Sequence, residues 1–138
     1  MSSAPSAAGK SVVGNYFEDF RVGQVIRHAI PRTVTSGDVA VYQACYGGRF
    51  AVQSSAHFAG AIGYPAGSGA PVDDLLVFHI VFGKTVPDIS LNAIANLGYA
   101  DVRFVKPVYC GDTLRAETRI TGLRENSNKE SGVVYVRS

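Results

Sequence analysis

The sequence predicts an α+β fold in which an antiparallel sheet wraps around one long buried helix. Residues 75–82 are apolar on every side of a helix, apart from His79, so a helix there has no face left for water. The residues after it alternate between apolar and polar, most clearly over 113–121, which is typical of strands with one buried face. Because a flat sheet covers only one side of a helix, a curled sheet is the favoured arrangement.

Length and composition fit a single globular domain. The chain has 138 residues, 46% of them hydrophobic and 17% charged, with a formal net charge of +2. Its basic residues are scattered, which argues against a nucleic-acid partner, and no apolar run approaches the roughly 20 residues that span a bilayer. Cys45 and Cys110 lack the spacing of a zinc or redox site, which favours reduced thiols in a soluble, cytoplasmic protein. We expect no metal, no organic cofactor and no membrane partner.

The N-terminal segment is expected to hold little regular structure. Residues 1–14 are small and polar and lack the apolar core of a secretory signal, so we expect a disordered tail followed by one domain over 15–138. Residues 25–34 have strand character but contain Pro31, which a central strand does not tolerate. They are interpreted as an edge strand or a bulge.

Two shorter helices are predicted ahead of the long one. Thr35 and Asp38 stand at capping-box spacing, and the helix they begin is expected to end at Gly47 after about three turns. A second, shorter helix is expected to start at Ser54 or Ser55.

The long helix and the strands after it complete the expected fold. Acids suited to a helix N-terminus, Asp73 and Asp74, begin the long helix, and Pro87 is expected to end it. Strands are then predicted over 92–106, 112–124 and 132–138, with a hairpin connection over 125–132. The last strand would present an unpaired apolar edge, so we interpret the sequence as cut short within its sheet.

One stretch of this sequence carries a family resemblance. Residues 103–114, RFVKPVYCGDTL, resemble the signature of MaoC-like hot-dog hydratases, and 16–26 and 35–47 resemble the motifs upstream of it. The block 77–92, VFHIVFGKTVPDISLN, is more specific and is similar to the N-terminal half of mesaconyl-CoA hydratases, also called β-methylmalyl-CoA dehydratases. The resemblance covers roughly residues 15–138. It implies a hot-dog fold and places the chain as the first repeat of a two-repeat hydro-lyase.

The same resemblance indicates that this half lacks the reacting groups. Enoyl thioester hydration needs an acid and a base, which the family supplies as an Asp and a His where this sequence has Gly48 and Gln53. Glutamine cannot exchange a proton near neutral pH, so we expect no catalytic residue here. The resemblance instead implies a lobe that shapes the acyl tunnel. The residues expected to contact substrate are Phe50, Gln53, Asp73, Asp74 and His79.

Structural roles compete with several of these assignments. The alternative for Asp73 and Asp74 is a purely structural role as helix N-terminal acids, without contact to substrate. The alternative for His79 is a hydrogen-bonded histidine in the core. Isolated basic residues such as Lys84, Arg103 and Lys106 could meet coenzyme A phosphates, although such residues are usually solvated.

Two functions follow from these observations. The first is half of an enoyl-CoA hydratase that adds water reversibly to mesaconyl-CoA and gives β-methylmalyl-CoA. The alternative is a non-catalytic acyl-CoA binding or scaffolding module. In both, the partner expected at the open edge is a second hot-dog repeat or another copy of the chain.

Overall fold

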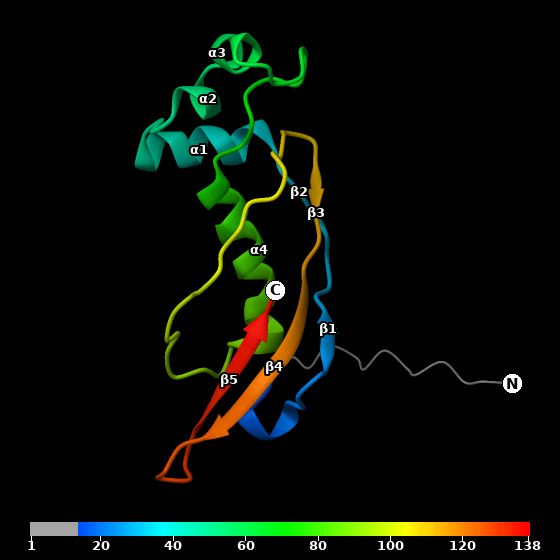
Figure 1. The fold of residues 1–138 in the computed structure, drawn as a ribbon, viewed down its shortest axis with the longest axis vertical. Coiled ribbons are helices and arrows are strands. Elements are labelled where there is room, and N and C mark those ends of the chain that lie inside the picture. The colour runs from blue at the N-terminus through cyan, green and yellow to red at the C-terminus, as the bar shows by residue number, and fades with distance from the viewer. Residues whose placement is uncertain (1–13) are drawn as a thin grey trace, which may run out of the picture. The chain divides into compact units, whose positions relative to one another are not determined.

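The structure is a computed structural model that describes residues 14–138. Of the predicted tail, residues 1–13 lie outside the described part, and Gly14 is buried. The elements in chain order are η1 (Phe17–Asp19), β1 (Val25–Arg27), β2 (Arg32–Thr33), α1 (Ser36–Tyr46), α2 (Ala51–Ser54), α3 (Ala56–Ala61), α4 (Asp74–Ile89), β3 (Thr113–Leu114), β4 (Glu117–Glu125) and β5 (Gly132–Arg137) (Figure 1). The chain divides into two compact units, and α4 runs from one into the other between Lys84 and Thr85.

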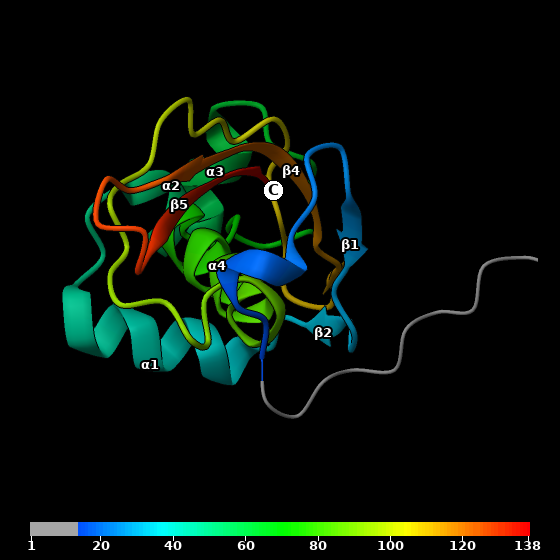
Figure 2. The same ribbon diagram turned by 90° about the horizontal axis from the view of Figure 1, so that it is seen from below.

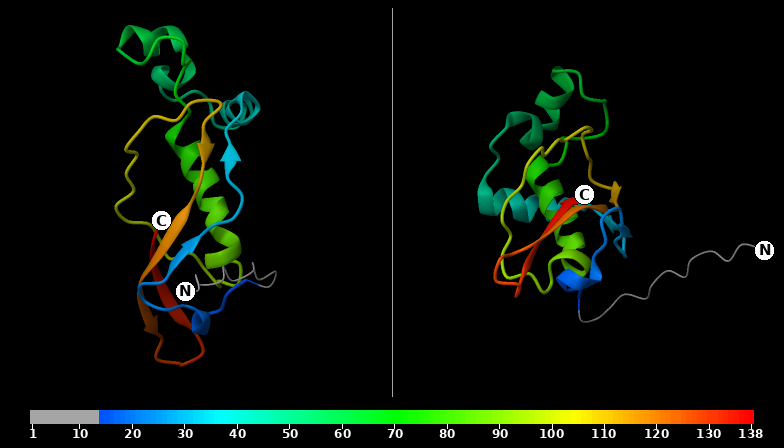
Figure 3. Two further views of the ribbon diagram at one scale, coloured as in Figure 1. Left: turned by 90° about the vertical axis from the view of Figure 1, so that its right-hand side faces the viewer. Right: turned by 60° about the horizontal axis from the view of Figure 1, so that its bottom comes forward.

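The first unit contains a three-stranded antiparallel sheet in the order β1-β4-β5. Figure 3 shows β1 beside β4, and β4 and β5 as the two arms of a hairpin. Along β4, Thr118 and Ile120 are buried while Glu117 and Arg119 are exposed, which confirms the alternation predicted from sequence. β5 lies at an edge of this sheet, with Tyr135 and Val136 exposed.

The 3-10 turn η1 in this unit packs against the hairpin. Figure 2 shows η1 next to the C-terminal end of α4, where Asn15 donates through Nδ2 to the carbonyl oxygen of Asp88 at 2.7 Å. A Cβ atom placed on Gly132, at the start of β5, would lie 2.2 Å from Cε2 of Phe17. The absence of a side chain at residue 132 is therefore what lets the aromatic ring lie on the strand.

Replacing Gly132 by valine is expected to destabilise the protein by about 1–3 kcal/mol, the usual cost of forcing extra carbons into a packed contact. The unfolding midpoint in urea measures this loss. Glycine at 122 offers a milder comparison, because its added Cβ would lie 3.3 Å from Cδ2 of Tyr135. Equal stability of wild type and Gly132→Val would show that Phe17 leaves its position without cost.

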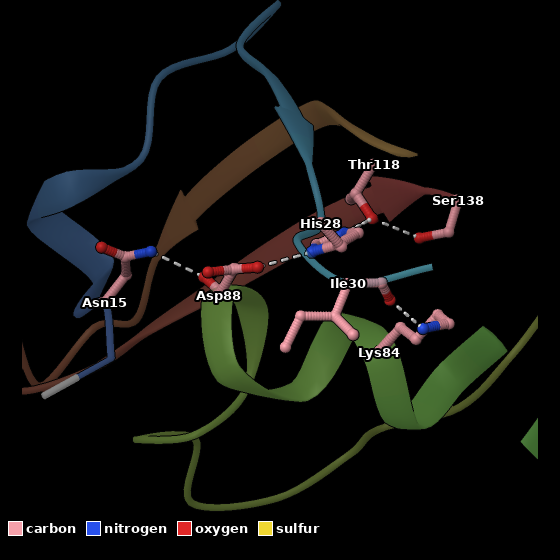
Figure 4. A network of polar contacts seen from close by, with 7 residues as sticks. All are labelled: Asn15, His28, Ile30, Lys84, Asp88, Thr118 and Ser138. Atoms are coloured by element: carbon pink, nitrogen blue, oxygen red, sulfur yellow. Dashed lines mark hydrogen bonds and ion pairs between the residues drawn. The ribbon is translucent and has the colours of Figure 1, made fainter. Parts of the chain in front are cut away.

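The same unit holds a chain of hydrogen-bonded polar groups centred on the buried His28 and Thr118 (Figure 4). His28 follows β1 and its side chain is fully buried; Nδ1 lies 2.7 Å from Oδ2 of Asp88 and Nε2 lies 2.7 Å from Oγ1 of Thr118. The Thr118 hydroxyl also lies 2.7 Å from Oγ of Ser138. Each buried polar atom of this histidine thus has a partner, as a structural histidine requires.

The second unit comprises residues 30–84 and 97–116. Its core consists of Val34, Tyr42, Val72, Leu76 and Ile80. The short strands β2 and β3 pair antiparallel in this unit (Figure 1).

The predicted helix boundaries of the second unit are largely confirmed. The Thr35 hydroxyl accepts from the backbone N–H of Asp38 at 3.3 Å, and Oδ2 of Asp38 accepts from the N–H of Thr35 at 2.9 Å. This is the expected capping box, and α1 ends with Gly47 as its C-cap. Ser55 caps α3 by accepting from the N–H of Phe58.

Two sequence predictions about secondary structure are wrong. α4 does not end at Pro87 but continues to Ile89. Contacts beyond the proline hold the extra residues, because Asp88 is bonded through its side chain to His28 and through its backbone carbonyl to Asn15. The predicted strand over 92–106 is absent, since no described strand pairs with this segment.

The predicted burial of α4 on every side is also wrong. Leu76 and Ile80 are buried, but Leu75 is 40% exposed and His79 is exposed as well. Tyr99, from the segment expected to form a strand, covers one face by packing edge-on against Phe78 and Phe82. Without a strand in that segment, the remaining face of the helix is left partly open.

Candidate functional site

A pocket of about 320 Å³ lies within the second unit. Its walls come from α2, the start of α4 and the segment that carries the family signature. The lining residues are Phe50, Val52, Gln53, Tyr64, Pro71, Val72, Asp74, Phe104, Val105, Lys106 and Pro107. Apolar side chains thus surround three strongly polar ones: an amide, a carboxyl and an ammonium group. Small-molecule sites combine apolar walls with a few polar groups, and in this pocket the polar groups make up the larger part of the accessible lining.

Gln53 presents an unused hydrogen-bond acceptor. It lies in α2, a single turn for which Phe50 is the N-cap residue, and its backbone oxygen accepts from Nε2 of Gln43 at 3.1 Å. The side-chain Oε1 atom is buried and has no hydrogen-bond partner among the described residues. A buried acceptor left unpaired costs about 1–3 kcal/mol, so such an atom is normally satisfied by water or a ligand.

The two acids at the start of α4 have different roles. Oδ1 of Asp73 accepts from the backbone N–H of Leu75 at 2.8 Å, which is the helix N-terminal role that competed with substrate contact. Asp74 is half-buried and lines the pocket. Burial, and secondarily the negative charge of Asp73, raises the pKa of the Asp74 carboxyl above its ordinary value. This carboxyl therefore keeps its proton to a higher pH than an exposed aspartate does.

The structure brings together three of the residues expected to contact substrate. Phe50, Gln53 and Asp74 line one pocket, whereas Gly48 and Asp73 are not among its lining residues. Gly48 lies close to Ser54, whose Cβ would be 3.0 Å from a Cβ added at residue 48.

His79 does not share the pocket either. Its side chain is exposed, with the ring 6.2 Å from that of Tyr42, so the core-histidine interpretation is wrong. The apolar neighbours of residue 79 in the sequence implied a buried helix position, but the structure exposes this position.

The three basic residues considered as contacts for coenzyme A phosphates have different surroundings in the structure. Lys84 donates from its ammonium group to the backbone oxygen of Ile30, and Arg103 pairs with Asp101 at 3.5 Å. Lys106 instead lines the same pocket as Asp74. Its position within the RFVKPV motif was the available signal for this, but the motif alone does not indicate what the lysine faces.

A second cavity, of about 520 Å³, lies along α1 and is mostly apolar. Its principal aromatic groups are Tyr42 and Tyr46, whose ring centroids are 4.7 Å apart. The one acid there, Asp38, is already bonded to Thr35 and Arg32, and the hydrogen bond from the Thr35 backbone above all lowers the pKa of its carboxyl. This cavity therefore lacks an unpaired carboxyl comparable with Asp74.

Residues 14–138 contain no group of three histidine, cysteine or acidic side chains placed to hold a metal ion. Within the same residues, no helix is both long and apolar enough to cross a membrane.

The antiparallel strands and the long helix define a hot-dog protein, and comparison with known proteins gives its family. The MaoC like domain matches residues 18–138, so the chain belongs to the MaoC-like family. It is 60% identical over 129 residues to a mesaconyl-CoA hydratase of Cereibacter sphaeroides, covering 94% of this chain and 37% of that protein. It is also 60% identical to a β-methylmalyl-CoA dehydratase of Chloroflexus aurantiacus, covering 95% and 36% respectively. The chain thus spans little more than a third of the length of these relatives.

Solved structures agree with this placement. A MaoC domain protein dehydratase from Chloroflexus aurantiacus is similar with a TM-score of 0.86 at 60% identity, over 94% of this chain and 36% of that one. A Mycobacterium tuberculosis protein described as a double hotdog fold is similar with a TM-score of 0.80 at 31% identity, over 92% of this chain and 39% of that one. The predicted hot-dog fold is confirmed.

Proposed function

We propose that this chain forms the substrate-tunnel half of a hydro-lyase that adds water reversibly to mesaconyl-CoA and gives β-methylmalyl-CoA. The 60% identity to a mesaconyl-CoA hydratase and a β-methylmalyl-CoA dehydratase is the observation that carries this proposal. The pocket lined by Phe50, Gln53 and Asp74 supports it, because it combines apolar walls with polar groups and is large enough for a short acyl group.

The acid and base of the reaction are proposed to come from outside this chain. Gly48 and Gln53 stand where the family has its proton carriers, and neither can exchange a proton near neutral pH. This chain then positions the acyl group, and a second hot-dog repeat, or another copy of the chain, supplies the reacting groups.

The open surfaces of both units support such a partner. In the first unit, the edge strand β5 exposes Tyr135 and Val136. In the second, Leu97 and Val105 are 75% and 89% exposed in a segment that pairs with no strand among the described residues. An exposed apolar edge strand or apolar segment is normally covered, and a second hot-dog repeat would cover the β5 edge and the segment of Leu97 and Val105. Cys45 and Cys110 are free and exposed, which is in keeping with a reducing cytoplasm as the proposed location.

The test is turnover of mesaconyl-CoA by the complete protein. Adding the protein to this thioester is expected to reduce its enoyl absorbance, without added metal or cofactor. Turnover of a crotonyl thioester with no loss of mesaconyl absorbance would refute the substrate assignment. Tight binding of both thioesters without any turnover would favour the non-catalytic acyl-CoA binding module instead.

A further inference from the structure

Neither charged group of the pocket has an ion-pair partner among the described residues. Lys106 and Asp74 are the two charged side chains that line it, together with the titratable hydroxyl of Tyr64. No ion pair of Lys106 or of Asp74 occurs among the described residues, so neither charge neutralises the other. The pocket therefore offers an ammonium group for a negative charge on a ligand.

From this arrangement we propose that Lys106 selects the substrate by binding the free carboxylate of its acyl group, and that Gln53 Oε1 accepts a hydrogen bond from the hydroxyl of the hydrated product. The proposal rests on the function proposed above and adds which end of the acyl group this pocket holds. It also assigns Lys106 as a specificity-determining residue.

The chemistry of the acyl group fits these two contacts. A mesaconyl group is a methyl-branched butenedioyl group, so it carries a carboxylate at the end away from the thioester, which a simple enoyl group lacks. An ammonium group is the natural complement of that carboxylate. Hydration adds a hydroxyl, which is a donor that the alkene does not have, and the buried Oε1 atom of Gln53 is an acceptor with no described partner.

Asp74 opposes the carboxylate when it is ionised. Its raised pKa means that the proton is lost less readily than from an ordinary aspartate, and the neighbouring charge of Asp73 contributes to this shift. A bound carboxylate adds a further negative charge, which favours the protonated form of Asp74 still more. Affinity for a dicarboxylic acyl-CoA should therefore fall as the pH rises through the pKa of Asp74, and Asp74→Asn should weaken that dependence.

The test compares two saturated, unreactive thioesters, methylsuccinyl-CoA and butyryl-CoA, which differ in the carboxylate. Calorimetric titration of the complete protein is expected to show roughly 2- to 5-fold tighter binding of methylsuccinyl-CoA. Lys106→Gln should weaken methylsuccinyl-CoA binding roughly 2- to 5-fold, the range for an ion pair that solvent screens, and leave butyryl-CoA nearly unchanged. Because Lys106 is exposed, this variant should fold normally. The matched control is Arg115→Gln, an exposed basic residue outside the pocket, which should change neither affinity.

The hydroxyl contact is tested separately with Gln53→Met. This variant should weaken β-methylmalyl-CoA about 2- to 10-fold relative to methylsuccinyl-CoA, because only the former can donate to Oε1. A carboxylate preference that survives Lys106→Gln would overturn the assignment of Lys106 and leave the proposed function standing. Failure of the wild-type protein to bind either thioester would overturn both.

Discussion

Replacing His28 by leucine is expected to lower the free energy of unfolding by about 2–5 kcal/mol, because each buried polar group that loses its hydrogen-bond partner costs about 1–3 kcal/mol. The imidazole is fully buried and bonded on both sides, to Asp88 and to Thr118. Leucine fills a similar volume but leaves a largely buried carboxylate and a buried hydroxyl without this partner. Urea denaturation, followed by circular dichroism, measures the change.

Two variants separate this effect from a general loss of charge. Asp88→Asn keeps an oxygen that can accept from Nδ1–H, so it should cost less than the loss of the ring. Arg27→Gln breaks the exposed pair with Glu117 in the neighbouring strand and should cost under about 1 kcal/mol. If His28→Leu costs no more than Arg27→Gln, the buried polar chain contributes little to stability.

The local signals in the sequence predicted the local structure well. Thr35 and Asp38 cap α1 as their spacing indicates, and alternation placed Thr118 and Ile120 on the buried face of β4. Helix capping and strand alternation both depend on residues within a few positions of one another, so the local sequence is sufficient to predict them. Pro87 shows the limit of this reasoning, because contacts to Asn15 and His28, distant in sequence, hold the helix beyond it.

The functional residues were harder to predict because their roles depend on neighbours remote in sequence. The family comparison located Gln53 and Asp74, but not that they share a pocket with Lys106. His79 lies among apolar residues in the sequence and yet is exposed, since what covers a helix face is decided by other segments. The strand expected over 92–106 failed for the same reason: alternation creates an apolar face, but a strand also needs a hydrogen-bonding neighbour.

The 138-residue chain by itself is expected to be a poor catalyst. Expressed alone, it is expected to hydrate mesaconyl-CoA at least about 10²-fold more slowly than the complete protein, since one missing general acid or base costs 10²–10⁴ in rate. Circular dichroism must first show that the chain is folded, and the complete protein at the same active-site concentration is the positive control.

Restoring the family residues within this chain should not recover the activity. Gln53→His would place an imidazole in the pocket, but Gly48 is not among the lining residues, so a carboxylate from Gly48→Asp would not face it. A Cβ at residue 48 would also crowd Ser54 at 3.0 Å. The one pocket carboxyl with a raised pKa, Asp74, remains a proton carrier in principle. Activity in the unmodified chain that Asp74→Asn abolishes would contradict the prediction and make Asp74, rather than a second repeat, the source of the proton.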